Sequence, residues 1–148
     1  MTADTPTQHD LLVLLPRLRR YARILTADLR LADDLVLETL SGASESRSPP
    51  ASWPQLRQRL FAVMHRVYGK HLARAPHKDS PPLCTHGHDA MLVRFARLPP
   101  DQREVLALVV LEGLLYTEIA EVLDIPVATV MSTLRSAREG IRSITAAS

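Results

Sequence analysis

Apolar residues recur at helical spacing in three segments of the N-terminal half. The first stripe runs from Leu11 to Leu25, the second from Leu31 to Leu40 and the third from Trp53 to Leu72. In each stripe the apolar side chains return every three or four residues and the charged ones fall on other faces, as in an amphipathic helix. Pro16 lies inside the first stripe, where it either begins the main helix or kinks it. Residues 8–75 therefore predict a three-helix bundle.

The C-terminal half predicts a second helical domain, of four helices, over residues 89–145. A short helix ends at Leu98, and Pro100 begins another that Gly113 can end. We expect the buried face of that helix at Val105, Leu106, Val109 and Val110. Helices over 117–123 and 126–144 follow. The breaker-rich residues 76–88 predict a linker, so the chain is expected to be all-α with two small domains.

Residues 116–138, YTEIAEVLDIPVATVMSTLRSAR, have the spacing of a helix-turn-helix. Ile119 is expected to bury the first helix, Asp124 to take the left-handed turn position and Val130 to anchor the second helix. The alternative is an ordinary helical hairpin with a proline turn. In a helix-turn-helix the exposed first turns of the second helix enter the major groove. The exposed positions here are Val127, Ala128, Met131, Ser132 and Arg135.

Charge is distributed unevenly between the two halves. Residues 1–76 hold eleven Arg/Lys and seven Asp/Glu, a net +4, whereas residues 77–148 hold seven and nine, a net −2. The N-terminal half therefore suits a polyanion better than the C-terminal half does. The longest apolar stretches are far below the roughly 20 residues of a membrane helix. With no signal peptide pattern and a single Cys84, the sequence predicts a cytoplasmic protein without membrane contact.

Two longer segments resemble a known family. LPPDQREVLALVVLEGLLYTEIAEVLDIPVATVMSTLRSARE resembles region 4 of the extracytoplasmic-function (ECF) group of bacterial sigma factors, and LLPRLRRYARILTADLRLADDLVLETL resembles their region 2, which Trp53 to Ala75 would complete. The resemblance implies that region 2 docks on RNA polymerase and opens the promoter −10 element, and that region 4 reads the −35 element. It implies three partners, namely core RNA polymerase, promoter DNA and an anti-sigma factor, and a monomer when free.

The resemblance also assigns residues of the first domain. Asp33, Asp34 and Glu38 match the acidic stretch beside the polymerase-binding surface, the alternative being a surface charge cluster. The third helix is the most basic segment and is the candidate for the melted −10 strand, unless it is simply a solvated face. Its candidate contacts are Arg57, Arg59, His65, Arg66, Lys70 and Arg74.

The recognition helix departs from the family pattern. The usual Pro-Val-Gly-Thr-Val-Lys-Ser-Arg stands here as Pro-Val-Ala-Thr-Val-Met-Ser-Thr, so Met131 and Thr133 replace two cations. The polar contacts that remain are Thr129, Ser132, Arg135 and Arg138. Two interpretations stay open: a sigma factor with unusual promoters, or a sigma-like regulator that binds an anti-sigma factor or other protein instead of promoter DNA. The apolar character of this surface suggests that the two domains pack together and hide it.

Neither a cofactor nor a catalytic site is indicated. No glycine-rich phosphate loop, nucleophile elbow or spaced carboxylate pair is present, so the chain is not expected to be an enzyme. The linker holds potential zinc ligands, but their spacing matches no common zinc finger, and a metal-free linker is the prediction. These residues are His77, Cys84, His86 and His88.

Overall fold

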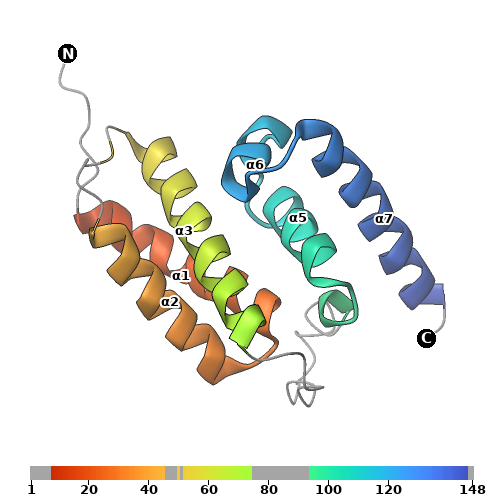
Figure 1. Ribbon diagram of the computed structural model, residues 1–148, viewed down its shortest axis with the longest axis horizontal. Helices are drawn as coiled ribbons and strands as arrows, with labels where there is room; N and C mark the ends of the chain where they lie inside the picture. The colour runs from red at the N-terminus through yellow and green to blue at the C-terminus, as the bar shows by residue number, and fades with distance from the viewer. Residues whose placement is uncertain (1–7, 46–49, 51, 75–93, 147–148) are drawn as a thin grey trace.

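The computed structural model describes residues 8–45, 50, 52–74 and 94–146, and these residues form helices without a strand among them. The elements are α1 (Gln8–Thr26), α2 (Leu29–Ser44), α3 (Trp53–Arg74), α5 (Pro100–Val110), α6 (Tyr116–Leu123) and α7 (Val127–Ala146). The all-α class is confirmed (Figure 1). The predicted linker, residues 76–88, falls wholly in residues 75–93, which lie outside the described residues, so the domain boundaries remain predictions. No helix of the described ranges is long and apolar enough to cross a bilayer.

Helices α1, α2 and α3 form the N-terminal bundle. The turn between α1 and α2 is short because Ala27 adopts a left-handed conformation (φ 53°) and Asp28 caps α2. The Asp28 carboxylate accepts hydrogen bonds from the backbone N–H groups of Arg30 (2.8 Å) and Leu31 (3.2 Å). Helix α1 begins at Gln8 and passes through Pro16, so the alternative in which Pro16 begins the helix is wrong.

Helices α5, α6 and α7 form the C-terminal domain, whose last two helices are the helix-turn-helix. Asp124 ends α6 in the left-handed conformation (φ 54°, ψ 51°), as its place in the motif predicts. Ile119 and Val130 are fully buried between α6 and α7. The chain reaches α6 from α5 through a turn in which Gly113 has a φ of 63°, a value that an L side chain rarely adopts.

The expectation for the buried face of α5 is partly wrong. Val105 and Leu106 are buried, but Val110 is 55% exposed. Arg103 and Glu104 lie in the interior instead, exposed by only 3% and 5%. Helix α5 contacts α7 on one side and α1 on another (Figure 1). Because two faces of the helix are covered, residues such as Arg103 and Glu104 are buried, although packing on one face alone would leave them in solvent.

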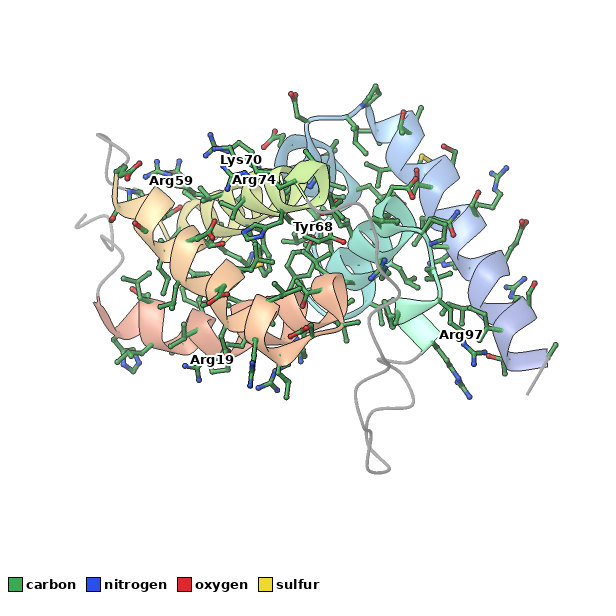
Figure 2. The ribbon with its side chains drawn as sticks, turned by 60° about the horizontal axis from the view of Figure 1, so that its bottom comes forward. Arg19, Arg59, Tyr68, Lys70, Arg74 and Arg97 are labelled. Carbon is green, nitrogen blue, oxygen red and sulfur yellow. The ribbon has the colours of Figure 1, made fainter. Side chains whose placement is uncertain are left out.

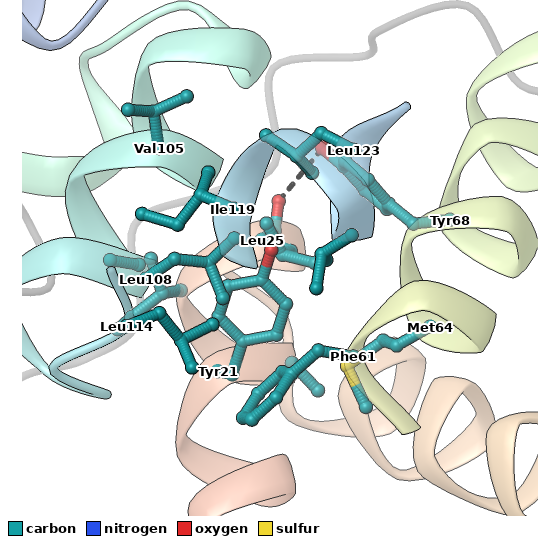
Figure 3. Packing of buried hydrophobic residues seen from close by; sticks show 14 of the residues in the cluster. Tyr21, Leu25, Phe61, Met64, Tyr68, Val105, Leu108, Leu114, Ile119 and Leu123 are labelled. Atoms are coloured by element: carbon teal, nitrogen blue, oxygen red, sulfur yellow. Dashed lines mark hydrogen bonds between the residues drawn. The ribbon is translucent and has the colours of Figure 1, made fainter. Parts of the chain in front are cut away.

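One hydrophobic core extends across the bundle and the C-terminal domain. Tyr21 of α1 and Phe61 of α3 meet edge to face, with ring centroids 5.1 Å apart. Leu108, Leu114 and Ile119 of the C-terminal domain belong to the same buried cluster (Figure 3). Helix α1 packs on α5 and α3 packs on α6, so the two domains are in direct contact.

Candidate nucleic-acid interface

The N-terminal half of α7 presents the predicted DNA-reading surface. Val127 and Met131 are 37% and 50% exposed, and Ala128, Thr129, Ser132, Arg135 and Arg138 are exposed too. The hypothesis that domain packing hides this surface is therefore wrong. The bundle packs on α5 and α6, which leaves the outward face of α7 accessible.

The same face of α7 borders a shallow groove of about 290 Å³. The groove has an apolar part and a cationic part. Tyr116, Met131 and Leu134 supply the apolar part, and Arg135, Arg138 and Arg142 follow along α7 beside Glu139. The cations missing at 131 and 133 are thus partly replaced by arginines further along the helix, of which Arg138 and Arg142 suit backbone phosphates more than base edges.

Some basic residues of α3 are exposed to solvent, and others lie at the contact with the C-terminal domain. Arg66 is exposed, as are Lys70 and Arg74, which Figure 2 labels. Arg59 is half-buried and lines an apolar cavity of about 460 Å³ at the end of the bundle. The other two predicted −10 contacts, Arg57 and His65, face the C-terminal domain and are already paired with its carboxylates.

Both of these pairs join α3 to the C-terminal domain. Arg57 Nη2 lies 3.0 Å from Glu118 Oε2, and His65 Nδ1 lies 2.9 Å from Glu104 Oε2. The hydrogen bond to the Glu104 carboxylate raises the pKa of His65 above its usual value, although burial acts against this. Burial raises the pKa of Glu104, and the neighbouring His65 only partly offsets it. Both pKa values are raised, so the His65–Glu104 pair binds a proton more tightly than either side chain does in water.

Glu112, which sequence reasoning missed, is the most buried of these carboxylates. Its side chain has no exposed surface and accepts hydrogen bonds from Arg17 Nε at 2.7 Å and Arg20 Nη2 at 3.0 Å. The same arginines also donate to backbone carbonyls, Arg17 to Glu112 at 3.2 Å and Arg20 to Leu111 at 3.0 Å. The two arginines of α1 thus hold the turn between α5 and α6.

A further polar junction joins α1, α3 and α5 at one carbonyl. The backbone oxygen of Leu25, near the end of α1, accepts hydrogen bonds from Tyr68 Oη at 2.9 Å and from Arg103 Nη1 at 3.0 Å (Figure 3 shows Tyr68 and Leu25). The last carbonyls of a helix lack partners within it, so these donors satisfy a group that burial would otherwise leave unpaired. Arg103 is buried for this reason.

All the described ion pairs between the domains have the same polarity. The donors Arg17, Arg20, Arg57 and His65 come from the bundle, and Gln58 adds a hydrogen bond to Glu121. The acceptors, which we call the interdomain carboxylates, all come from the C-terminal domain. They are Glu104, Glu112, Glu118 and Glu121. This polarity agrees with the uneven charge of the two halves, +4 against −2, which sequence analysis interpreted only as attraction to a polyanion.

The predicted polymerase-binding residues lie on the outer face of α2. Asp33, Asp34 and Glu38 are exposed, and Glu38 pairs with His71 of α3 at 3.1 Å. Leu37, at 66% exposed, lies among them. An acidic face that includes an exposed leucine suits a protein partner that carries cations around an apolar contact.

The structure gives no test of the linker as a metal site. Within the described residues no group of three or more His, Cys, Asp or Glu side chains is placed to hold a metal ion. The four weak candidates His77, Cys84, His86 and His88 lie outside the residues that the structure describes.

Comparison with known sequences matches each half of the chain to a sigma-type domain. Residues 88–139 match the family model "Sigma-70, region 4", and residues 11–65 match "Sigma2 domain of PhyR". The ECF RNA polymerase sigma factor EcfG of Rhodopseudomonas palustris (strain TIE-1) is 29% identical over 149 residues, which cover 91% of this chain and 82% of that protein.

Solved structures share the fold over most of the chain. The sigma factor RpoE of Bartonella quintana, in complex with the anti-sigma factor NepR, aligns with a TM-score of 0.73 and 21% identity, over 93% of this chain and 95% of that one. The PhyRSL–NepR complex of Sphingomonas sp. Fr1 aligns with a TM-score of 0.71 and 22% identity, over 91% of this chain and 86% of that one. The anti-anti-sigma factor PhyR of B. quintana, crystallised with NepR, aligns with a TM-score of 0.64 and 17% identity over 90% of this chain, which spans 48% of PhyR.

Proposed function

We propose that this chain is an ECF-type sigma factor with a region 2 and a region 4, and that it binds core RNA polymerase and directs transcription initiation at promoters. Region 2 would comprise residues 8–75 and region 4 residues 89–145, joined by 76–88. The protein would act in the cytoplasm, without enzymatic activity of its own. The observation that carries the proposal is the exposed reading face of α7, which stays accessible although α5 and α6 are covered by the bundle.

Region 4 would read the −35 duplex through the first turns of α7. Arg135 and Ser132 are the exposed polar side chains closest to the helix start after Thr129, so they are the candidates for base edges. Arg138 and Arg142 follow at helical spacing and would contact phosphates.

Region 2 would contact polymerase through α2 and the melted −10 strand through α3. The exposed Asp33, Asp34 and Glu38 support the first contact, and the exposed Arg66, Lys70 and Arg74 support the second. Single-stranded DNA binds basic faces with a strong dependence on salt, as such a helix predicts.

A second candidate function is a sigma-like regulator that binds an anti-sigma factor in place of a true sigma factor. Two observations favour it: residues 11–65 match the sigma domain of PhyR, and the exposed Met131 is apolar where the family carries lysine. The similar solved structures are of complexes with the anti-sigma factor NepR. We therefore expect a protein of that kind as a partner under either function.

Reconstituted transcription discriminates the two functions. Core RNA polymerase is supplied with the purified chain and a library of promoter sequences, and transcript starts are sequenced. Starts that require the chain and share upstream −10 and −35 sequences support the sigma factor. Absence of such starts, together with tight binding of a NepR-type protein to the free chain, would establish the regulator instead.

A further inference from the structure

We propose that region 4 selects its −35 element through thymine methyl groups, which Val127 and Met131 of α7 contact in the major groove. The inference rests on the proposed function and adds to it the kind of base that is read. Thymine presents a C5 methyl group in the major groove beside its O4 oxygen, and apolar side chains are the groups that recognise this methyl. Val127 and Met131 are therefore specificity-determining residues, and Met131 is one that the family pattern does not supply.

The first two turns of α7 offer little hydrogen-bonding chemistry to a base. Residues 127–134 contain no Arg, Lys, Asp, Glu, Asn or Gln. These are the side chains that pair most specifically with the edges of guanine, cytosine and adenine. The exposed hydroxyl of Ser132 already donates its proton to the backbone oxygen of Thr129, at 3.1 Å. What this part of the helix presents to the groove is therefore mainly apolar surface.

That apolar surface forms a row along the accessible side of the helix. Helix α7 lies on the side of the C-terminal domain away from the bundle (Figure 1). Val127 and Met131 are 37% and 50% exposed, whereas Val130 is buried. Residues four apart on a helix lie about 5–6 Å from each other on one face. Since one base pair occupies about 3.4 Å of the duplex, the two side chains reach thymines one or two base pairs apart.

The residues around the row allow it to lie against base edges. Met131 and Tyr116 line the same groove, and Arg138 and Arg142 follow in it at the distance along α7 that suits phosphates. Phosphate contacts position a helix but do not select a sequence, so selection falls to the row. An unbranched methionine adapts its shape to an irregular apolar surface, as a methyl group between base edges presents. Burial of one methyl-sized group changes affinity by about fourfold.

The test removes single methyl groups from the DNA. Holoenzyme is reconstituted from core RNA polymerase and the full chain, and the probe is a promoter duplex recovered from the transcription library. Each thymine on either strand of its −35 region is replaced in turn by deoxyuridine, which keeps the O4 oxygen and lacks only the methyl group. Competition against the unmodified duplex should show binding about fourfold weaker at two positions, one or two base pairs apart, and unchanged at the other thymines.

Variants then assign the two positions to side chains. Val127→Ala and Met131→Ala should each abolish the deoxyuridine effect at one position. The matched control is Val110→Ala, which shortens an exposed valine of α5 and should keep both effects. Met131→Lys should raise the overall affinity through phosphate attraction and still lose the effect at its position. Selection of the base is thereby separated from electrostatic attraction and from the stability of the helix.

Equal binding of the thymine and deoxyuridine duplexes by the wild type would overturn this inference, and the proposed function would stand. Effects that persist in both alanine variants, or a −35 element recognised without any thymine, would overturn it in the same way. A holoenzyme that selects no upstream sequence at all refutes the proposed function together with the inference.

Discussion

Replacing Glu112 by glutamine removes one negative charge from the domain contact and keeps the length and shape of the side chain. In the wild type the carboxylate is fully buried and accepts hydrogen bonds from Arg17 (2.7 Å) and Arg20 (3.0 Å). The glutamine has one acceptor oxygen and one amide group, so one of the two arginines then faces a donor instead of an acceptor. The closed arrangement must therefore lose stability.

The size of the loss follows from the two bonds. A hydrogen bond to a charged group contributes about 1.5–3 kcal/mol and a neutral one about 0.5–1.5 kcal/mol. One bond is lost and the other becomes weaker, but Arg20 is half exposed and regains water. We expect a net loss of about 2 kcal/mol in the free energy of unfolding. This is below the roughly 3–5 kcal/mol observed when a fully buried ion pair loses one partner.

Urea unfolding measures this loss. The transition is followed by far-ultraviolet circular dichroism and by the fluorescence of Trp53, and linear extrapolation gives the free energy. The control is Glu139→Gln, which removes one exposed carboxylate from α7 away from the contact. Its expected effect is within about 0.5 kcal/mol. An equally small effect of Glu112→Gln would refute the reasoning, since the buried pair would then contribute nothing.

Three further predictions follow from the same structure. The hydrogen bond to Glu104 raises the pKa of His65, and burial raises that of Glu104, so the folded chain binds more protons than the unfolded one. The stabilisation by His65 is complete below pH about 6.5 and is lost as the pH rises through its raised pKa, so the difference in unfolding free energy between wild type and His65→Gln should shrink from pH 6 to pH 9. Asp124→Ala forces alanine into a left-handed turn and should cost about 1 kcal/mol in thermal unfolding, whereas Asp124→Gly should cost less; equal costs would contradict this. In binding assays with −35 duplex DNA, Arg135→Ala should weaken the affinity by about 1–3 kcal/mol if Arg135 reads a base, and an unchanged affinity removes Arg135 from the contact surface. Met131→Lys should strengthen the binding and steepen its salt dependence by about one unit.

The sequence predicted the local features of the fold well. The helical stripes, the turn at Asp124 and the burial of Ile119 and Val130 depend on residues within one or two helices of each other, where spacing and turn chemistry are decisive. The exposed face of α7, which is predicted to read DNA, also followed from spacing alone, because the buried positions Val130 and Leu134 fix which residues point outward.

What the sequence did not predict depends on the contact between the domains. Arg17 and Arg20 lie off the apolar stripe of α1 and look like solvated cations, and nothing local marks Glu112 as their partner, 92 to 95 residues away. Val110 appeared as part of a buried face because the second packing surface of α5 was unknown. The uneven charge of the two halves indicated attraction to a polyanion, but it does not say that the polyanion includes the other half of the same chain.

The distance between the two domains, measured in one labelled protein with and without polymerase and promoter DNA, tests the account most directly. Single cysteines at Ser41 and Ser143, both exposed, carry a dye pair in a Cys84→Ser background. The account predicts efficient energy transfer in the free chain and a large loss of transfer in the complex that initiates transcription. Efficient transfer that persists in the initiating complex would contradict the account, because region 2 and region 4 would then reach two separate promoter elements while their domains stay in direct contact.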